Sequence, residues 1–534
     1  MKRVGIDFGT STTLVAYRLS DSSAPEILPI GRTVPWMPSV LTESDPMLVG
    51  EDAEAREDRK SSVKSDLTRG QGAGISSAVS RSQVKAIMAE AVARAKAKNK
   101  DIFKDAKVFL GCPALWTLTN RKMIADIANE LNLDVDIANV IDEPVAAGVQ
   151  WSNNQLFRGT QKLPDGKALI FDAGGGTLDI AFLHLGKEGS QSSDKPEVTV
   201  LSAKSLEQAG DSLDEAVCEY LRTRDPDLAD QDAGEKELRR VSRALKEALS
   251  FQDEESVNAG RPFSRPIVLT RNELESIFAT QLQDSMDLVR AVVKESLFRT
   301  KSSVSAIDVR EKKFTELCDD VKFVVLVGGF SSMPVFEREL RKSFKKAEFV
   351  RLEKPQQAVA EGLTYGDQYI RLNMPRPPLS FFIKSKSHKS EEICVYQAFS
   401  EVYHQDDLFQ GRSYLSTRLD LQNLGSGEFS FWCEIPDRAR TRVPFEVSTK
   451  QGEKEIFETI SITQDLRSQS GHLIFVLYTT GEICIQGLDK QFLLRSKFWP
   501  RLADGTDLAD IRLEVERSTR EEFGNFDLEW WRSK

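Results

Sequence analysis

Two stretches of the chain share one pattern: VGIDFGTSTTLVAY at residues 4–17 and LIFDAGGGTLDIAFL at residues 169–183. Each reads as an apolar strand that reaches an aspartate, a turn containing glycine and threonine, and a second apolar strand. The spacing between Asp7 and Asp172 is too long for a solenoid repeat. The pattern therefore predicts a fold built from two duplicated halves.

The sequence around these stretches alternates short apolar runs with helical patterns. Residues 81–98 and 120–131 place apolar side chains on one helical face. Residues 323–344 read as a strand, Gly328-Gly329 and a helix, with Ser332 as the helix N-cap and Pro334 in its first turn. Strands that alternate with helices predict an α/β fold.

Composition narrows the class of protein. The 534 residues include 72 basic and 82 acidic side chains, for a net charge of −10, which disfavours electrostatic capture of nucleic acid or an anionic membrane. No apolar run is long enough to cross a bilayer. The six cysteines are scattered and only four histidines occur, so zinc is not expected. We expect a cytoplasmic protein with reduced thiols.

The residue pattern changes from helical to strand-like after MPRPP at residues 374–378. Short aromatic and β-branched runs follow, and residues 472–478 and 483–488 read as a hairpin. Prolines cannot continue a helix or a central strand, so they mark a boundary. We predict an α/β domain at 1–372, a linker at 373–380, a β-rich domain at 381–503 and a tail at 504–534.

The two turns could bind a polyphosphate from both sides. Glycines at a tight turn let backbone N–H groups point into one concavity that suits a phosphate. Asp7 and Asp172 could hold a hydrated Mg²⁺ that bridges phosphate oxygens. Either hairpin alone could be an ordinary Asp-Gly turn, and only the pair favours phosphate binding. The candidate turn residues are Gly9, Thr10, Ser11, Thr12, Gly174, Gly175, Gly176 and Thr177, with Gly328 and Gly329 at the third turn.

These three elements, in this order, resemble the superfamily of actin, sugar kinases and DnaK-type chaperones. FDAGGGTLDIA (171–181), VIDEPVAAG (140–148), VGGFSSMP (327–334) and KPQQAVAEG (354–362) resemble motifs of the seventy-kilodalton heat-shock chaperones. The resemblance covers about residues 1–372. It implies a duplicated actin-like ATPase fold that binds ATP or ADP with Mg²⁺. GHLIFVLYTTGEICIQGLDK (471–490) faintly resembles a hairpin of their β-sandwich peptide-binding domain.

The resemblance also implies roles for single residues. Lys64 matches the lysine that holds the attacking water, and Glu143, Asp172 and Thr177 match polar groups around the γ-phosphate. The residues also admit other readings: Lys64 could be a solvated loop lysine and Glu143 a carboxylate that stabilises its own helix. Pro113 and Arg121 match residues that relay nucleotide state. Lys246 and Ser250 match adenosine contacts, or are surface positions of a helix.

Several positions depart from the family pattern. Ser332 replaces the adenine-stacking arginine, Arg243 replaces a glutamate of the adenosine site, and Asn139 replaces a basic residue of the interdomain interface. The acidic, leucine-rich linker is missing. These departures place the adenine preference in doubt and predict weak coupling between nucleotide and partner binding.

Three functions remain open at this point. The first is a diverged DnaK-like ATPase whose β domain binds an unfolded peptide or a dedicated protein partner, with cochaperones as further partners. The second is a small-molecule kinase, for which Asp179 could face an alcohol. The third is an actin-like scaffold with little turnover. Phe429 and Phe431 could line a partner site or belong to the core.

Overall fold

The computed structural model describes most of the first 371 residues and the strands of the C-terminal part. The described ranges are 1–54, 56, 58–69, 77–114, 116, 118–136, 139–157, 164–186, 198–224, 235–258, 265–300, 313–366, 370–371, 380–385, 392–396, 415–420, 427–434, 441–443, 445–448, 454–457, 460–462, 472–477, 483–486 and 492–494. The predicted tail and all of the predicted linker except Ser380 lie outside them.

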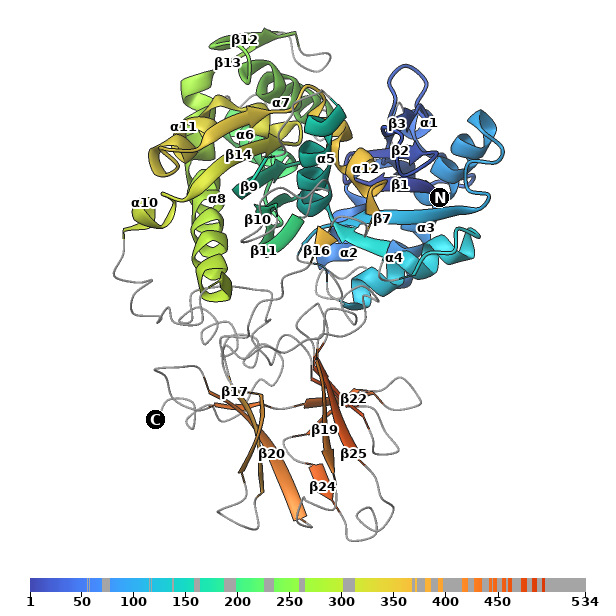
Figure 1. The fold of residues 1–534 in the computed structure, drawn as a ribbon. Helices are drawn as coiled ribbons and strands as arrows, with labels where there is room; N and C mark the ends of the chain where they lie inside the picture. Colours follow the sequence, from blue (N-terminus) through green and yellow to red (C-terminus); the bar gives the residue numbers. More distant parts are fainter. Residues whose placement is uncertain are drawn as a thin grey trace. The chain divides into compact units, whose positions relative to one another are not determined.

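The first sheet is built around the first repeated stretch (Figure 1). Its strand order is β3-β2-β1-β7-β8, with β4 also paired to β2. β1 and β2 are antiparallel, whereas β1, β7 and β8 run parallel. Val4, Ile6 and Phe8 alternate along β1 into one core because successive strand side chains point to opposite faces. The strands are β1 (Lys2–Phe8), β2 (Thr12–Arg18), β3 (Glu26–Leu28), β4 (Met37–Pro38), β7 (Ala106–Cys112) and β8 (Val140–Asp142).

The second sheet repeats this topology. Its order is β15-β14-β9-β10-β11-β16, so β11, β10, β9, β14 and β15 correspond to β3, β2, β1, β7 and β8, with the same strand directions. β16 is an addition at the edge, parallel to β11. The predicted duplication is therefore confirmed. The strands are β9 (Gly166–Ala173), β10 (Leu178–Leu185), β11 (Val198–Leu206), β14 (Val321–Val327), β15 (Glu348–Arg351) and β16 (Ile370–Arg371).

Helices α5 (Glu143–Phe157) and α12 (Ala358–Leu363) lie between the two sheets (Figure 1). α12 packs on β1, β2 and β7, α5 packs on β9 and β10, and the two helices pack on each other. Two glycines allow this close approach. A Cβ on Gly5 would lie 2.5 Å from the Ala360 carbonyl oxygen, and a Cβ on Gly362 would overlap the carbonyl of Ala146.

The other helices cover the outer faces of the sheets or connect strands. The helical patterns predicted at 81–98 and 120–131 are confirmed by α3 and α4, with the second helix ending one residue before the predicted bound. The bounds are α1 (Glu51–Glu54), α2 (Val63–Arg69), α3 (Ser77–Lys98), α4 (Leu118–Glu130), α6 (Gly210–Arg224), α7 (Glu235–Leu249), α8 (Arg271–Thr300), α10 (Phe314–Leu317) and α11 (Pro334–Ser343), with short strands β5 (Leu41–Thr42), β6 (Arg59–Lys60), β12 (Glu254–Val257) and β13 (Ile267–Thr270).

The prediction that Ser332 caps the helix after the Gly-Gly turn is wrong. Phe330–Ser332 form a 3₁₀ turn, so the N-cap position falls on Met333, which makes no side-chain cap bond. Pro334 is the first residue of α11, as predicted, because its missing N–H has no helical partner to lose at that position.

The C-terminal part contains two antiparallel sheets. One has the order β18-β17-β20-β21 with β24 on β20, and the other β19-β25-β26-β27-β22-β23. The predicted hairpin pairing is confirmed by β25 and β26. Phe429 and Phe431 are fully buried, which favours the core reading. The strands are β17 (Ser380–Ser385), β18 (Glu392–Tyr396), β19 (Leu415–Asp420), β20 (Gly427–Glu434), β21 (Thr441–Val443), β22 (Phe445–Ser448), β23 (Lys454–Phe457), β24 (Ile460–Ile462), β25 (His472–Leu477), β26 (Ile483–Gln486) and β27 (Phe492–Leu494).

The chain divides into two compact units. The first comprises Met1–Arg290 and Phe314–Arg371, and the second Ala291–Lys313 and Leu372–Lys534. The domain boundaries expected from the sequence stay predictions. In the ranges that the structure describes, no helix is both long enough and apolar enough to cross a membrane.

The packing of α12 generates a stability prediction. Gly362→Ala should lower the free energy of unfolding by about 1–3 kcal/mol, because the new methyl group overlaps the backbone of α5. Urea unfolding monitored by circular dichroism measures the change. Gly329→Ala is the matched control, since a Cβ there meets no atom within 4 Å and the backbone angles suit alanine. Equal stability of the two variants would contradict this account of the packing.

Candidate functional site

The two predicted phosphate turns close in the same way and face each other. The Gly9 N–H donates to the Thr12 carbonyl at 2.9 Å, and the Gly174 N–H donates to the Thr177 carbonyl at 3.0 Å. A Cβ on Gly176 would lie 2.5 Å from Thr10 Oγ1. A Cβ on the preceding Gly175 would clash with Ser11 Oγ. Gly175 and Gly176 are therefore required because hydroxyl side chains of the first turn pack against their backbone.

The predicted catalytic and metal-binding side chains lie together beneath these turns. Asp7 and Asp172 occupy matching positions near the ends of β1 and β9, and both are buried. Glu143, the first residue of α5, forms an ion pair with Lys64 of α2. Thr177 is also buried, in the second turn. The structure thus brings the predicted catalytic set to one place.

Lys64 is not a solvated loop lysine. Its side chain is 2% exposed. Besides Glu143 it has two aromatic neighbours, with Nζ 5.9 Å from the ring centre of Phe8 and 5.7 Å from that of Trp116. The surrounding carboxylates Glu143 and Asp7 raise the pKa of Lys64 against the opposing effect of burial, so the ammonium is charged at neutral pH.

The carboxyl groups here would carry more negative charge than Lys64 balances if all of them were ionised, and their pKa values are raised accordingly. Burial and the charge of Glu143 raise the pKa of Asp7 to about 7, although Lys64 opposes the shift. Burial, followed by the charge of Asp179, raises the pKa of Asp172 well above its usual range. A cation added at this point would favour the ionised carboxylates.

Asp179 extends the cluster. It is the cross-strand neighbour of Asp172, and burial raises its pKa to about 7. Its carboxylate accepts the backbone N–H of Ala114 at 3.0 Å and the hydroxyl of Ser205. Ser205 was not singled out from the sequence. The pairing of β10 with β11 places Ser205 directly opposite Asp179, so a predicted strand register could have identified this residue.

The Gly-Gly turn lies against Asp172. Gly328 has φ of +78°, and a Cβ there would lie 2.6 Å from Asp172 Oδ1 and clash with the Ala173 carbonyl. Glycine is needed on both grounds. The Ser331 hydroxyl closes the turn by donating to the Gly328 carbonyl at 2.8 Å. At Gly329 the backbone is open, so a ligand could approach it.

Of the two predicted adenosine contacts, only Lys246 borders the phosphate turns. Its Nζ donates to the Gly210 carbonyl at 2.8 Å and pairs with Asp214 at 2.7 Å. The Gly210 N–H in turn donates to the Gly174 carbonyl at 3.2 Å. Ser250 donates to the Lys246 carbonyl of its own helix at 3.2 Å. The buried Lys246 is therefore more than a surface helix position.

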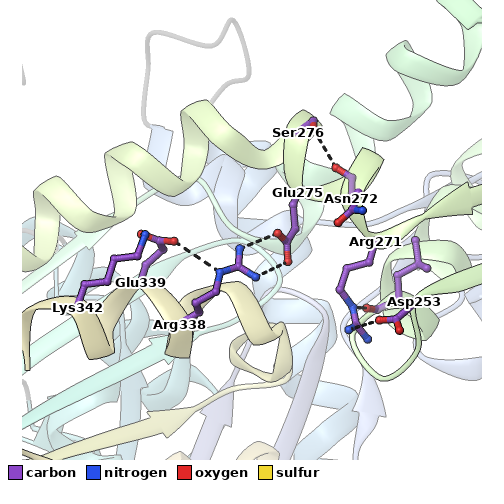
Figure 2. Close-up of polar contacts among 9 residues, drawn as sticks. Asp253, Arg271, Asn272, Glu275, Ser276, Arg338, Glu339 and Lys342 are labelled. Carbon is purple, nitrogen blue, oxygen red and sulfur yellow. Dashed lines mark hydrogen bonds and ion pairs between the residues drawn. The ribbon is translucent and has the colours of Figure 1, made fainter. Parts of the chain in front are cut away.

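Ion pairs fasten the helices that border the Gly-Gly turn and Lys246 (Figure 2). Arg338 of α11 points at Glu275 of α8 and donates to both carboxylate oxygens, at 3.1 and 2.6 Å. Arg271, the first residue of α8, donates to the Leu249 carbonyl at the end of α7 at 2.9 Å and pairs with Asp253 at 2.5 Å. These contacts join α7, α8 and α11 into one supporting layer.

The residues proposed to relay nucleotide state also adjoin the site. Arg121 pairs with Asp142, the neighbour of Glu143, and donates to the Trp116 and Val140 carbonyls at 3.1 and 3.2 Å. Pro113 precedes the N–H that reaches Asp179. At the predicted interface position, Asn139 is buried and its N–H donates to the Asp136 carbonyl at 2.8 Å.

The donor set fits a hydrated magnesium ion with phosphate. Among the described residues, no group of three or more His, Cys, Asp or Glu side chains is placed to hold a metal alone. Mg²⁺ commonly binds through one or two carboxylates and completes its octahedron with water and phosphate oxygens. Asp7 and Asp172, beside two glycine-bearing turns, suit that mode of binding.

The ion pair of Lys64 generates a second prediction. Lys64→Met should lower the free energy of unfolding of the ligand-free protein by about 3 kcal/mol, because Glu143 would remain buried without its partner. The double variant Lys64→Met/Glu143→Gln should recover part of this loss. Urea unfolding measures both, with Lys85→Met at a partly exposed pair as the control. A loss no larger than that of the control would contradict the role of the buried pair.

Comparison with known proteins identifies the family to which the chain belongs. The model of the family described as Hsp70 protein matches residues 73–366. The "Chaperone protein DnaK" of Thermotoga maritima is 24% identical over 381 residues, which cover 67% of this chain and 58% of that protein. The "Chaperone protein HscA homolog" of Burkholderia multivorans is 29% identical over 432 residues, covering 73% and 63%. The matched region thus spans less than two thirds of these relatives. Since the family model matches more than half of the chain, this protein belongs to the Hsp70 family.

Proposed function

We propose that this protein binds ATP with Mg²⁺, hydrolyses it slowly and uses the nucleotide to regulate the binding of a protein partner, as a cytoplasmic chaperone of the DnaK type. The observation that carries the proposal is the pair of matching turns that face each other above Asp7, Asp172, Lys64 and Glu143. Membership of the Hsp70 family and the chaperone names of the relatives support it.

The residues divide by the part of the nucleotide that each would hold. Backbone N–H groups and hydroxyls of Thr10, Ser11, Thr12 and Thr177 suit phosphate oxygens, and Asp7 and Asp172 suit the hydrated metal. Gly328, Gly329 and Lys246 lie where the nucleoside end would be accommodated. When bound, Mg²⁺–ATP supplies the phosphoanhydride bond and the neutralisation of its charge.

The chain itself contributes a base and a means of fixing it. The carboxylate of Glu143 can accept a proton from a water molecule or orient that water. Lys64 restrains this carboxylate through their ion pair. Its ammonium group would also be a hydrogen-bond donor to a water molecule held beside Glu143. The rings of Phe8 and Trp116 lie beside Lys64, whose side chain is almost fully buried. This arrangement suits hydrolysis, in which water is the acceptor.

The β-rich C-terminal unit is the proposed partner-binding part, for an unfolded peptide or a dedicated protein, with cochaperones as further partners. Phe429 and Phe431 belong to its core, where Phe431 stacks on Phe381 with ring centres 5.7 Å apart. The partner would therefore contact other side chains of this unit.

The metal role of Asp172 is tested by Asp172→Asn. The amide keeps the size of the side chain but loses the charge that attracts Mg²⁺, so ATP affinity measured by calorimetry should fall more with Mg²⁺ than with a chelator. Asp165→Asn, just before the start of the same strand, is the control. Equal losses in both conditions would remove Asp172 from the metal site.

Hydrolysis is tested by Glu143→Gln. The variant should lose roughly 10²-fold in turnover, the scale of general-base catalysis, with nearly unchanged nucleotide affinity. Phosphate release measures turnover, and the exposed Glu130→Gln is the control. A fully active variant would leave Glu143 as a helix-terminal carboxylate.

Wild-type phosphate transfer to a sugar or alcohol would favour a kinase, and tight binding without turnover would favour a scaffold.

A further inference from the structure

A hydrogen bond joins the two halves at a place that the roles above do not use. The Ser62 hydroxyl donates to Asp211 Oδ2 at 3.0 Å, across 149 positions of sequence. Ser62 directly precedes α2, the helix that carries Lys64, and belongs to the first half. Asp211 is the second residue of α6, in the second half.

Asp211 is held against the second phosphate turn. Its backbone N–H donates to the Gly175 carbonyl at 2.7 Å, next to the bond from Gly210 to Gly174. A Cβ on Gly175 would lie 3.3 Å from Asp211 Oδ1, so the carboxylate lies beside the turn. The acceptor therefore moves with this turn.

Ser62 makes this contact from an unfavourable backbone conformation. Its φ is +59°, in the left-handed region that costs free energy for residues other than glycine. Its carbonyl accepts the Ser65 N–H at 2.9 Å, so the residue caps α2 through its backbone. The side chain, which in most N-cap serines bonds to the same helix, instead reaches the other half.

We propose that the Ser62–Asp211 hydrogen bond, here named the clasp, holds the two halves together over the phosphate turns and so slows nucleotide release. The proposal rests on nucleotide binding by the two turns. Ser62 and Asp211 act as positioning residues: they fix the start of α2, and with it Lys64, against the turn that α6 supports.

Release of a fluorescent ADP analogue, followed by stopped flow on the full-length protein, tests the clasp. Ser62→Gly and Asp211→Ala should each accelerate dissociation about tenfold, the scale of a hydrogen bond to a charged group. The double variant should be no faster than either single variant, because both remove one contact. Asp211→Asn, which keeps an acceptor oxygen, should restore part of the slow release. Ser22→Gly, in an exposed turn of the first half, is the control.

Ser62→Gly distinguishes an effect of the clasp on nucleotide release from a general effect on stability. Glycine relieves the positive φ, so the temperature of unfolding should not fall even though release is faster. Unchanged release in both single variants, or additive effects in the double variant, would overturn the clasp while leaving nucleotide binding in place.

A nucleotide-free measurement distinguishes this failure from failure of the proposed function. In the absence of nucleotide, the clasp variants should show faster hydrogen exchange at the amides of Gly210 and Asp211, which bond to the turn. If the wild-type protein binds no nucleotide but these amides lose protection in the variants, the proposed function is overturned together with the effect on release, and the hydrogen bond is retained only as a contact that holds the two halves together. Unchanged protection would overturn the clasp.

Discussion

The burial of several carboxyl groups around one lysine is the constraint on which the rest of the structure depends. Asp172 and Asp179 are cross-strand neighbours at strand ends of the second sheet, and the meeting of the two halves brings Asp7, at the end of β1 in the first sheet, within electrostatic range of Asp172. Lys64 enters from α2 and offsets part of this charge through Glu143. Such a cluster costs free energy unless it is matched by an opposite charge, and this imbalance is the physical reason to expect a cation among these residues.

The positions of the glycines determine how closely the elements around the site can pack. Where backbone must come close to backbone or to a hydroxyl, the chain has no Cβ: at Gly5 and Gly362 around α12, at Gly175 and Gly176 in the second turn, and at Gly328 beside Asp172. The first group sets how near the two sheets can lie, and the second sets how near the turns lie to each other. The geometry of the site is therefore fixed by the packing of elements outside it.

The duplication could be predicted because its signal is local: a strand, an aspartate, a turn and a strand, repeated once. The placement of Lys64 depended on a family resemblance, since VKSDLTRG contains nothing that indicates a buried lysine. Ser62, Ser205 and Asp211 were not found, because each acts through a partner brought close by sheet pairing or by the meeting of the halves. The N-cap at Ser332 failed because a 3₁₀ turn competes locally for the same residues.

The position of α12 has a consequence for how the protein is made. Residues 358–363 pack on β1, the first strand of the chain, and Ala360 shares a small core with Leu14 and Ala16. At about 5–20 residues per second, synthesis of the chain between β2 and α12 takes roughly 20–70 s. Until then the apolar surface of β1 and β2 that α12 covers stays open to solvent. The first sheet is therefore completed only after more than 340 further residues have been made, so its folding waits for the second half.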